Sequence, residues 1–205
     1  MQNTRRLALI ALLLLAGLAG CGEKVPRLSP VGADGVIVAF GDSLTYGTGA
    51  SESESYPVIL GQLIERKVVR AGVPGEVTEQ GLARLPEVIE EHRPALIIVC
   101  LGGNDMLRRV ADERIRANLR EIIRTIQGQG ISVMLVGVPK PALITSAAAF
   151  YAEVAAEFDI PYEGAIVTDV LYQRDLKSDP IHPNGKGYRM MAEAIAKLLK
   201  KAGAI

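Results

Sequence analysis

A histidine is the side chain that most often serves as a general base near neutral pH, and this chain of 205 residues has two. His182 lies in the segment Asp-Pro-Ile-His-Pro-Asn at 179–184, where two prolines restrict the backbone. Three residues earlier, Asp179 could reach the imidazole, fix its tautomer and stabilise the imidazolium. On spacing alone, a helix-capping aspartate beside an unrelated histidine remains an equal alternative. The other histidine, His92, is expected to be solvated at a helix end.

A serine that follows a short apolar run supplies a candidate nucleophile. Ser43 lies in Gly-Asp-Ser-Leu-Thr at 41–45, directly after the apolar residues 36–40. Its hydroxyl would project from the corner between a strand and a loop, which alone is weak evidence. Together with His182 and Asp179, however, it completes the three groups of nucleophile, base and orienting acid that acyl transfer requires.

Other catalytic patterns are missing from the sequence. No serine has glycine two residues before and two residues after it, which disfavours the nucleophile elbow of the α/β-hydrolases. Gly-Thr-Gly at 47–49 lacks the third glycine of a dinucleotide loop, and Gly-Lys at 185–186 lacks the upstream glycine of a phosphate loop. Two histidines and one thiol in the mature domain do not suggest a zinc site. We therefore expect neither a cofactor nor a metal ion.

The elements that must position these residues alternate between apolar runs and amphipathic stretches. Short, β-branched runs at 36–40, 95–101 and 132–138 are typical of buried parallel strands, and weaker strands are predicted at 67–70 and 165–169. Apolar residues at helical spacing indicate helices between them. The positions that share a helix face are Leu60, Leu63 and Lys67; Leu82, Leu85 and Ile89; Ile115, Leu119, Ile122 and Ile126; and Tyr188, Met191, Ile195 and Leu198. Further helix is predicted over 147–158 and 184–200. This alternation predicts an α/β fold, a three-layer α/β/α sandwich around a parallel sheet.

Ligands of open parallel sheets bind beyond the carboxyl ends of the strands. Gly-Asp-Ser at 41–43, Gly-Gly-Asn at 102–104 and Val-Pro at 138–139 all fall at such ends, although each is also an ordinary turn sequence. Asp42 and Asp105 follow strands too, and we expect them to brace loops through hydrogen bonds.

The first twenty residues have the pattern of a signal peptide. Arg5 and Arg6 precede an apolar run at 7–15, and Leu-Ala-Gly-Cys at 18–21 resembles the bacterial lipobox, in which the cysteine is lipidated and becomes the first mature residue. Lipidation of Cys21 is favoured over ordinary secretion. We expect a signal peptide at 1–20, a tether at 21–35 rich in glycine and proline, and one domain at 36–205. Cys100, inside an apolar run, is expected to be a buried thiol without a disulfide.

Composition narrows the range of partners. The chain has 23 basic and 23 acidic residues, and removal of residues 1–20 leaves 21 against 23. With no positive field, a nucleic-acid partner is not expected. The predicted partners are a small-molecule or lipid acyl substrate and, through lipidated Cys21, a membrane. An exported, membrane-anchored monomer facing the periplasm or the cell exterior is expected.

Four sequence blocks together resemble the GDSL or SGNH hydrolases. They are Gly-Asp-Ser-Leu at 41–44, the glycine-rich stretch around Gly75, Gly-Gly-Asn-Asp at 102–105 and Asp-x-x-His at 179–182, in the family order. The segment Gln-Gly-Leu-Ala-Arg-Leu-Pro at 80–86 is similar to the bacterial acyl-CoA thioesterase I, lysophospholipase L1 and arylesterase group. The resemblance implies a flavodoxin-like sheet of five parallel strands with the site at its carboxyl edge.

The resemblance also implies roles for individual residues. Ser43 would attack the carbonyl, His182 would transfer the proton, and Asp179 would orient His182. The backbone N–H groups of Ser43 and Gly75 and the side-chain amide of Asn104 would form the oxyanion hole. Two departures, Arg70 where relatives often carry asparagine and Pro74 before the glycine, leave Gly72 as an alternative donor.

These observations favour a serine esterase or thioesterase of the arylesterase, lysophospholipase or acyl-CoA thioesterase type. A deacetylase of cell-envelope carbohydrate is the alternative within the enzyme class, because the same machinery serves any acyl group. A lipid-binding lipoprotein without catalysis is a weaker alternative, since a binder does not need this set of residues.

Overall fold

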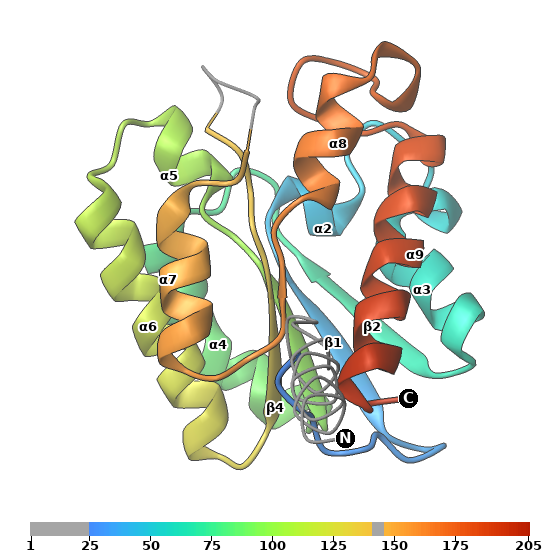
Figure 1. Cartoon of the computed structure of the whole chain (residues 1–205), viewed down its shortest axis with the longest axis vertical. Helices are drawn as coiled ribbons and strands as arrows, with labels where there is room; N and C mark the ends of the chain where they lie inside the picture. Colours follow the sequence, from blue (N-terminus) through green and yellow to red (C-terminus); the bar gives the residue numbers. More distant parts are fainter. Residues whose placement is uncertain (1–24, 141–145) are drawn as a thin grey trace, which may run out of the picture.

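The computed structural model describes residues 25–140 and 146–205. Its centre is a five-stranded parallel sheet in the order β2-β1-β3-β4-β5 (Figure 1). The strands are β1 (Val36–Gly41), β2 (Lys67–Gly72), β3 (Leu96–Cys100), β4 (Ser132–Val136) and β5 (Tyr162–Glu163). This is the flavodoxin-like order, in which the chain crosses back over β1 after β2 and adds β3, β4 and β5 in turn on the other side of β1. The prediction of a three-layer α/β/α fold is confirmed.

Helices cover both faces of the sheet (Figure 1). One face carries α3 (Tyr56–Ile64) and α9 (Gly185–Ala202), with α8 (Ile166–Tyr172) beside α9. The other carries α4 (Thr78–His92), α6 (Asp112–Gly128) and α7 (Ala149–Glu157). The short helices α2 (Ser43–Tyr46) and α5 (Gly103–Leu107) directly follow β1 and the β3 loop. The 3₁₀ turns η2 (Glu52–Glu54) and η3 (Arg174–Leu176) complete the described elements.

The fifth strand was predicted in the wrong place. Residues 165–169 begin α8, and the fifth strand is the two-residue β5 just before them. The β-branched run Ile-Val-Thr resembles a strand by propensity, but the Glu163 carboxylate accepts the N–H groups of Ala165 and Ile166 at 3.0 and 3.1 Å. That cap satisfies free donors at a helix start. Burial of Val167, Val170 and Leu171 at helical spacing favours helix in this tertiary setting.

The predicted inner face of the first crossover helix is right at Leu60 and wrong at its other two positions. Lys67 lies in β2 rather than in α3, and Leu63 is 45% exposed. The buried residues of α3 are Tyr56, Pro57, Ile59 and Leu60, so the buried face lies in the first half of the helix. By contrast, all four apolar positions predicted for each of α6 and α9 are buried.

The N-terminal segment contacts the domain before β1 begins. The N–H groups of Leu28 and Val31 donate to the carbonyls of Ala202 and Ala204 at 3.0 and 2.8 Å, and Val31 is buried. Residues 25–35 of the predicted tether therefore lie against the end of α9. The predicted signal peptide and Cys21 lie outside the described residues. Within the described ranges, no helix has the length and apolar character needed to cross a bilayer.

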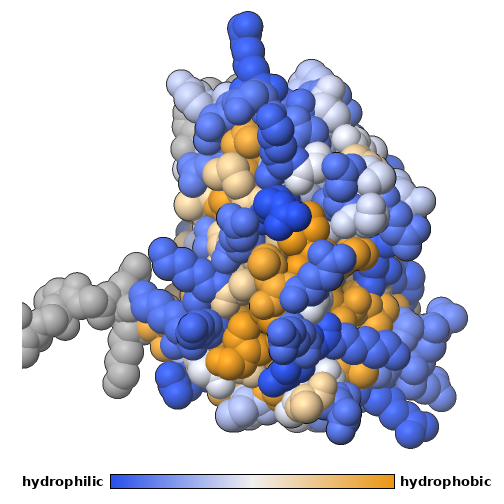
Figure 2. All heavy atoms as spheres, turned by 90° about the vertical axis from the view of Figure 1, so that its right-hand side faces the viewer, coloured by the Kyte–Doolittle hydropathy of each residue, from blue (hydrophilic) through white to orange (hydrophobic). Residues whose placement is uncertain are grey.

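The sheet provides the core, and charged residues dominate the surface. β3 is fully buried, and Cys100 at its end is inaccessible, as predicted. On the face over α3 and α9, apolar side chains lie between charged ones (Figure 2). The carboxyl ends of β1 and β3, at the switch in strand order, place Ser43 and Asn104 side by side at the edge where ligands bind.

Candidate active site

Three predicted site residues meet above the carboxyl edge of the sheet. His182 Nε2 lies 3.1 Å from Ser43 Oγ, and His182 Nδ1 lies 2.7 Å from Asp179 Oδ2. The hydroxyl comes from the start of α2, whereas the imidazole and carboxylate come from the loop before α9. This is the geometry in which an imidazole can take a hydroxyl proton while its second nitrogen is held by an acid.

Asp179 shapes the loop that carries His182. Its Oδ1 accepts the backbone N–H groups of both Ile181 and His182 at 2.9 Å, while Oδ2 faces the imidazole. Partial burial acts to raise the pKa of Asp179, but hydrogen bonds from the His182 ring and from the two backbone N–H groups outweigh it and hold the pKa below its usual range. A charged carboxylate therefore both folds the loop and orients the ring.

The residues after the histidine hold the loop to α9. Asn184 is the N-cap of α9, and its Oδ1 accepts the N–H groups of Lys186 and Gly187. Its Nδ2 donates to the carbonyl of Asp175 at 2.9 Å, and its N–H donates to that of Leu176 at the same distance. The chain between η3 and α9 is thus fixed on both sides of His182.

Ser43 occupies the first position of α2. Asp42 is the N-cap of this helix, and its Oδ1 accepts the N–H of Leu44 at 3.0 Å. The first N–H groups of a helix have no partner within the helix, so the Ser43 N–H is suited to a ligand oxygen. As predicted, Asp42 braces the loop.

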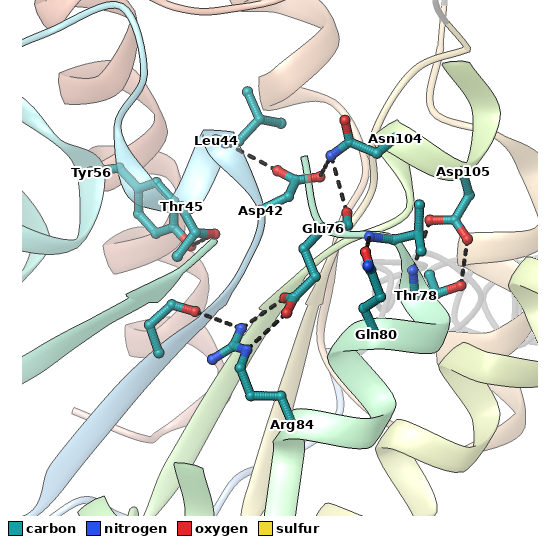
Figure 3. A network of polar contacts seen from close by, with 12 residues as sticks. Asp42, Leu44, Thr45, Tyr56, Glu76, Thr78, Gln80, Arg84, Asn104 and Asp105 are labelled. Carbon is teal, nitrogen blue, oxygen red and sulfur yellow. Dashed lines mark hydrogen bonds and ion pairs between the residues drawn. The ribbon is translucent and has the colours of Figure 1, made fainter. Parts of the chain in front are cut away.

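Asn104 is tied to two neighbouring loops. Its Nδ2 donates to Asp42 Oδ2 at 3.2 Å and to the carbonyl of Glu76 at 3.1 Å (Figure 3). An amide has two N–H bonds, and both have acceptors here. To serve a substrate oxygen, Asn104 must share or release one of these rather long bonds.

The glycine next to this amide lies in a tight turn. The N–H of Glu76 donates to the carbonyl of Val73 at 3.1 Å, with Pro74 and Gly75 at the central positions. Gly75 has a φ of +81°, which the third position of a type II turn requires, and proline is common before it. The departure at Pro74 is therefore compatible with the turn.

Gly72, the alternative donor, lies in the sheet. It pairs with Gly41 at the end of β2, and a Cβ there would lie 2.2 Å from the backbone nitrogen of Tyr46. Glycine is required at position 72 because β2 approaches α2 so closely there. The geometry favours Gly75, which lies in the loop that contacts Asn104.

Buried carboxylates lie near Ser43 and Asn104. Asp105 accepts the N–H and the hydroxyl of Thr78 at 2.8 and 2.6 Å, which ties α5 to α4 as a brace. Burial raises the pKa of Asp42 to about 7; the Leu44 N–H opposes this rise, whereas the nearby carboxylates of Glu76 and Asp105 add to it.

An apolar cleft opens beside Ser43 and His182. Its empty space, mouth included, is about 470 Å³. Apart from the polar residues Asp42, Ser43, Asn104 and His182, its lining comes from Leu44, Gly103, Leu107, Val138, Pro139, Leu171, Pro180 and Ile181. A cleft with apolar walls and polar groups at one end is typical of a small-molecule site.

Sequence patterns indicated some of this lining and missed the rest. The Val-Pro pair at 138–139, at a predicted strand end, lines the cleft. Leu171 was missed because the residues just before it, 165–169, were assigned to a strand. Glu76 and Arg84 under the Gly75 turn were also missed, because nothing in the sequence indicates that these two residues meet.

Comparison with known proteins agrees with the geometry. The model of the GDSL-like lipase/acylhydrolase family matches residues 39–190, a range that contains Ser43, Asn104 and His182. The chain belongs to this family. Members of the GDSL-like lipase/acylhydrolase family that resemble it are ester hydrolases, and this chain is an ester hydrolase acting on acyl substrates.

Two curated relatives and one solved structure illustrate the family likeness. Thioesterase 1/protease 1/lysophospholipase L1 of Escherichia coli is 32% identical over 172 residues, which cover 80% of this chain and 83% of the relative. The arylesterase of Vibrio mimicus is 26% identical, over 96% of this chain and 98% of its own. The crystal structure of AlinE4, an SGNH-hydrolase family esterase, superimposes with a TM-score of 0.62 at 30% identity, over 84% of this chain and 98% of that one.

Proposed function

We propose that this family member hydrolyses acyl esters or thioesters through a triad of Ser43, His182 and Asp179. The observation that carries the proposal is the continuous hydrogen-bonded series from Asp179 through His182 to Ser43, which ends at an apolar cleft. Ser43 Oγ attacks the carbonyl carbon while His182 Nε2 takes the hydroxyl proton. His182 then gives this proton to the departing alcohol or thiol, which leaves the acyl group on Ser43.

Water completes the cycle by the same chemistry. His182 takes a proton from water, the resulting hydroxide attacks the acyl carbon, and the proton returns to Ser43 as the carboxylic acid leaves. Asp179 keeps the proton on Nδ1 of His182 and stabilises the imidazolium. Its lowered pKa supports this role, because the carboxylate stays ionised over the neutral range.

The oxyanion donors in this proposal are the N–H groups of Ser43 and Gly75 and the amide of Asn104. Three features support them: the free first position of α2, the turn at Gly75, and the contact of Asn104 with that turn. The carbonyl oxygen would take one N–H of Asn104 from its present acceptors. Loss of one such donor typically lowers turnover about 10²–10³-fold.

The apolar lining of the cleft supports an acyl chain as the bound group. Leu44, Leu107, Val138, Leu171 and Ile181 offer hydrocarbon contacts and few hydrogen-bond partners. The names of the two curated relatives, which include thioesterase, lysophospholipase and arylesterase, support the same range of substrates. A comparison of p-nitrophenyl esters, acyl-CoAs, lysophospholipids and acetylated glycans would rank them.

The proposal includes an anchor outside the described residues. Lipidation of Cys21 would place the monomeric enzyme on a membrane, facing the periplasm or the cell exterior. The lipobox-like residues 18–21 support it. Partition into the detergent phase that is lost in Cys21→Ser would support the anchor, and equal partition would reject it.

Turnover of p-nitrophenyl butyrate tests the catalytic proposal. Ser43→Ala should lower turnover to the residual rate that the oxyanion hole and substrate binding provide without the nucleophile. A Ser43→Ala variant as active as the wild type would reject it.

A further inference from the structure

An ion pair under the Gly75 turn connects two of the three proposed oxyanion donors, Gly75 and Asn104, to the scaffold. Glu76 lies in that turn, and its carbonyl accepts the Asn104 amide at 3.1 Å. Gly75, in the turn after β2, and Asn104, in α5, thus meet through Glu76, whose bond to Asn104 is drawn in Figure 3. The position of Glu76 determines the position of both donors.

The side chain of Glu76 extends toward Arg84 (Figure 3) and is 5% exposed. Its carboxylate receives two bonds from Arg84 of α4, from Nε to Oε1 at 2.8 Å and from Nη2 to Oε2 at 2.7 Å. Such a two-bond pair fixes distance and orientation together. Glu76 is therefore held against α4.

Arg84 is itself fixed by the sheet. Its Nη2 also donates to the carbonyl of Ala71 in β2 at 3.2 Å, and its guanidinium lies 4.5 Å from the ring centroid of Phe40 in β1. The guanidinium, which α4 carries, thus contacts β1, β2 and the Gly75 turn at once. A buried ion pair contributes little to stability compared with apolar packing. Stability alone therefore does not explain why Glu76 and Arg84 are paired here.

We propose that Glu76 and Arg84 are positioning residues, which hold the Gly75 turn and the Asn104 amide in the geometry needed to bind the developing oxyanion. This role rests on the proposed hydrolysis at Ser43. Neither residue touches the substrate, and both act through the donors. Their contribution is therefore expected in kcat rather than in KM.

Kinetics of Arg84→Met and Arg84→Lys with p-nitrophenyl butyrate test this role. Arg84→Met should lower kcat about tenfold, part of the ~10²–10³-fold typical of complete loss of a donor, with KM within about twofold. Arg84→Lys keeps the charge but not the paired bonds, so its kcat should lie between the values for the wild type and Arg84→Met. Arg120→Met is a control for the loss of an ion pair away from the site, because it removes a more exposed 2.7 Å pair to Glu157 between α6 and α7.

A double-mutant cycle separates positioning from general loosening of the fold. In an Asn104→Ala background one of the two positioned donors is already gone. Arg84→Met should therefore lower kcat in that background by about threefold or less. An unchanged kcat in Arg84→Met and Arg84→Lys, or the same tenfold loss with and without Asn104, would overturn the proposal. Full activity of Ser43→Ala would instead reject the hydrolytic function itself.

A separate observation concerns the direction in which the cleft faces. The N-terminal segment is bonded through Leu28 to Ala202, at the last residue of α9. His182 lies just before the first residue of that helix. With 18 residues, α9 is about 27 Å long, so the segment docks roughly one helix length from the catalytic histidine. Figure 1 likewise shows the C-terminus at the end of the molecule opposite α2 and α5.

Cys21 precedes Val25 by four residues, and Val25 packs against the core. A chain spans at most about 3.6 Å per residue, so four residues allow a reach of at most about 14 Å from Val25. We infer that a lipid on Cys21 holds the bilayer near the C-terminal end of α9 and leaves the cleft facing the aqueous side. This rests on the proposed lipidation. The substrate would then be an acyl ester that arrives from water, not an acyl lipid of the anchoring bilayer.

Energy transfer to a bilayer tests this orientation without using activity. The lipidated protein, bound to phosphatidylcholine vesicles with an acceptor dye on their headgroups, carries a donor dye on either Lys201→Cys or Tyr172→Cys. Both residues are exposed, Lys201 near the end of α9 and Tyr172 next to Leu171 of the cleft, while Cys100 is buried and should not be labelled. Stronger quenching at position 201 is expected. Equal or stronger quenching at 172 would overturn the inference, and failure to bind the vesicles would reject the lipidation on which it rests.

Discussion

His182 Nε2 lies 3.1 Å from Ser43 Oγ, although 139 positions separate the two residues in sequence. The contact joins the loop after the first strand to the loop before the last helix. Because the base and its acid share one short loop, any change that moves this loop changes the whole triad.

Asp179→Asn tests the orientation of the imidazole. Asparagine keeps an oxygen that can accept the N–H groups of Ile181 and His182, so the loop should stay folded. Its NH2 group would face Nδ1 as a donor and cannot accept the hydrogen bond from Nδ1–H, which favours the wrong tautomer of His182. By analogy with other triads, kcat should fall about 10³–10⁴-fold at neutral pH, with little change in thermal stability. A loss smaller than tenfold would show that Asp179 does not orient the base.

Gly75→Ala tests the turn as a source of an oxyanion donor. A Cβ at this position meets no heavy atom closer than Arg108 Nη2 at 3.9 Å, so the cost is backbone strain of about 1–3 kcal/mol rather than a clash. Gly130→Ala is a matched control, because Gly130 has a φ of +74° and open space far from the site. Both variants should lose similar stability in urea unfolding, but only Gly75→Ala should lose kcat. Equal kcat values would count against Gly75 as a donor.

The apolar cleft predicts a loss of substrate binding on Leu107→Ser. Leu107 lines the cleft and is 45% exposed, and Leu63 on α3 is equally exposed but lies away from it. Loss of the leucine contact, worth about 1 kcal/mol, should raise KM for p-nitrophenyl hexanoate about fivefold in Leu107→Ser and leave it unchanged in Leu63→Ser. If the two variants behave alike, the acyl chain binds elsewhere.

The raised pKa of Asp42 predicts that the free energy of unfolding depends on pH. Its pKa of about 7 in the folded state exceeds the ordinary value of 3.8, so between these values the folded protein binds more protons than the unfolded chain. This contribution to the free energy of unfolding is therefore full below about pH 4 and is lost as pH rises to about 7, a change of up to about 4 kcal/mol.

Urea unfolding at pH 5 and pH 8 measures this contribution. Asp42→Asn carries no titrating proton at this site and should flatten the dependence, whereas the exposed Asp34→Asn should not. The same difference between pH 5 and pH 8 in wild type and Asp42→Asn would contradict the prediction.

Local patterns predicted most of the scaffold. The central strands β1 and β3 are buried except at Val36, so their apolar runs identify them. The four-position stripes of α6 and α9 coincide with the buried faces of these helices. The prediction of the fifth strand failed because residues 165–169 have strand propensity but begin a helix that the Glu163 carboxylate caps. The residue types alone do not reveal this cap.

The site residues likewise include some that the sequence predicts and some that it does not. Ser43, Asp179 and His182 could be found from sequence because their chemistry is distinctive and two of them are near neighbours. The pair of Glu76 and Arg84 is eight residues apart across a turn and a helix, and in sequence it resembles any other surface charge pair. Only the packing of α4 against β1 and β2 makes it a buried contact.

Covalent labelling of Ser43 tests the central claim most directly. A fluorophosphonate reacts with a serine that has been activated by a neighbouring base, and mass spectrometry locates the adduct. The wild-type protein should carry one adduct on the peptide that contains Ser43, with none in Ser43→Ala and strongly slowed labelling in His182→Ala. An adduct on another residue, or equal labelling of Ser43→Ala, would contradict the account.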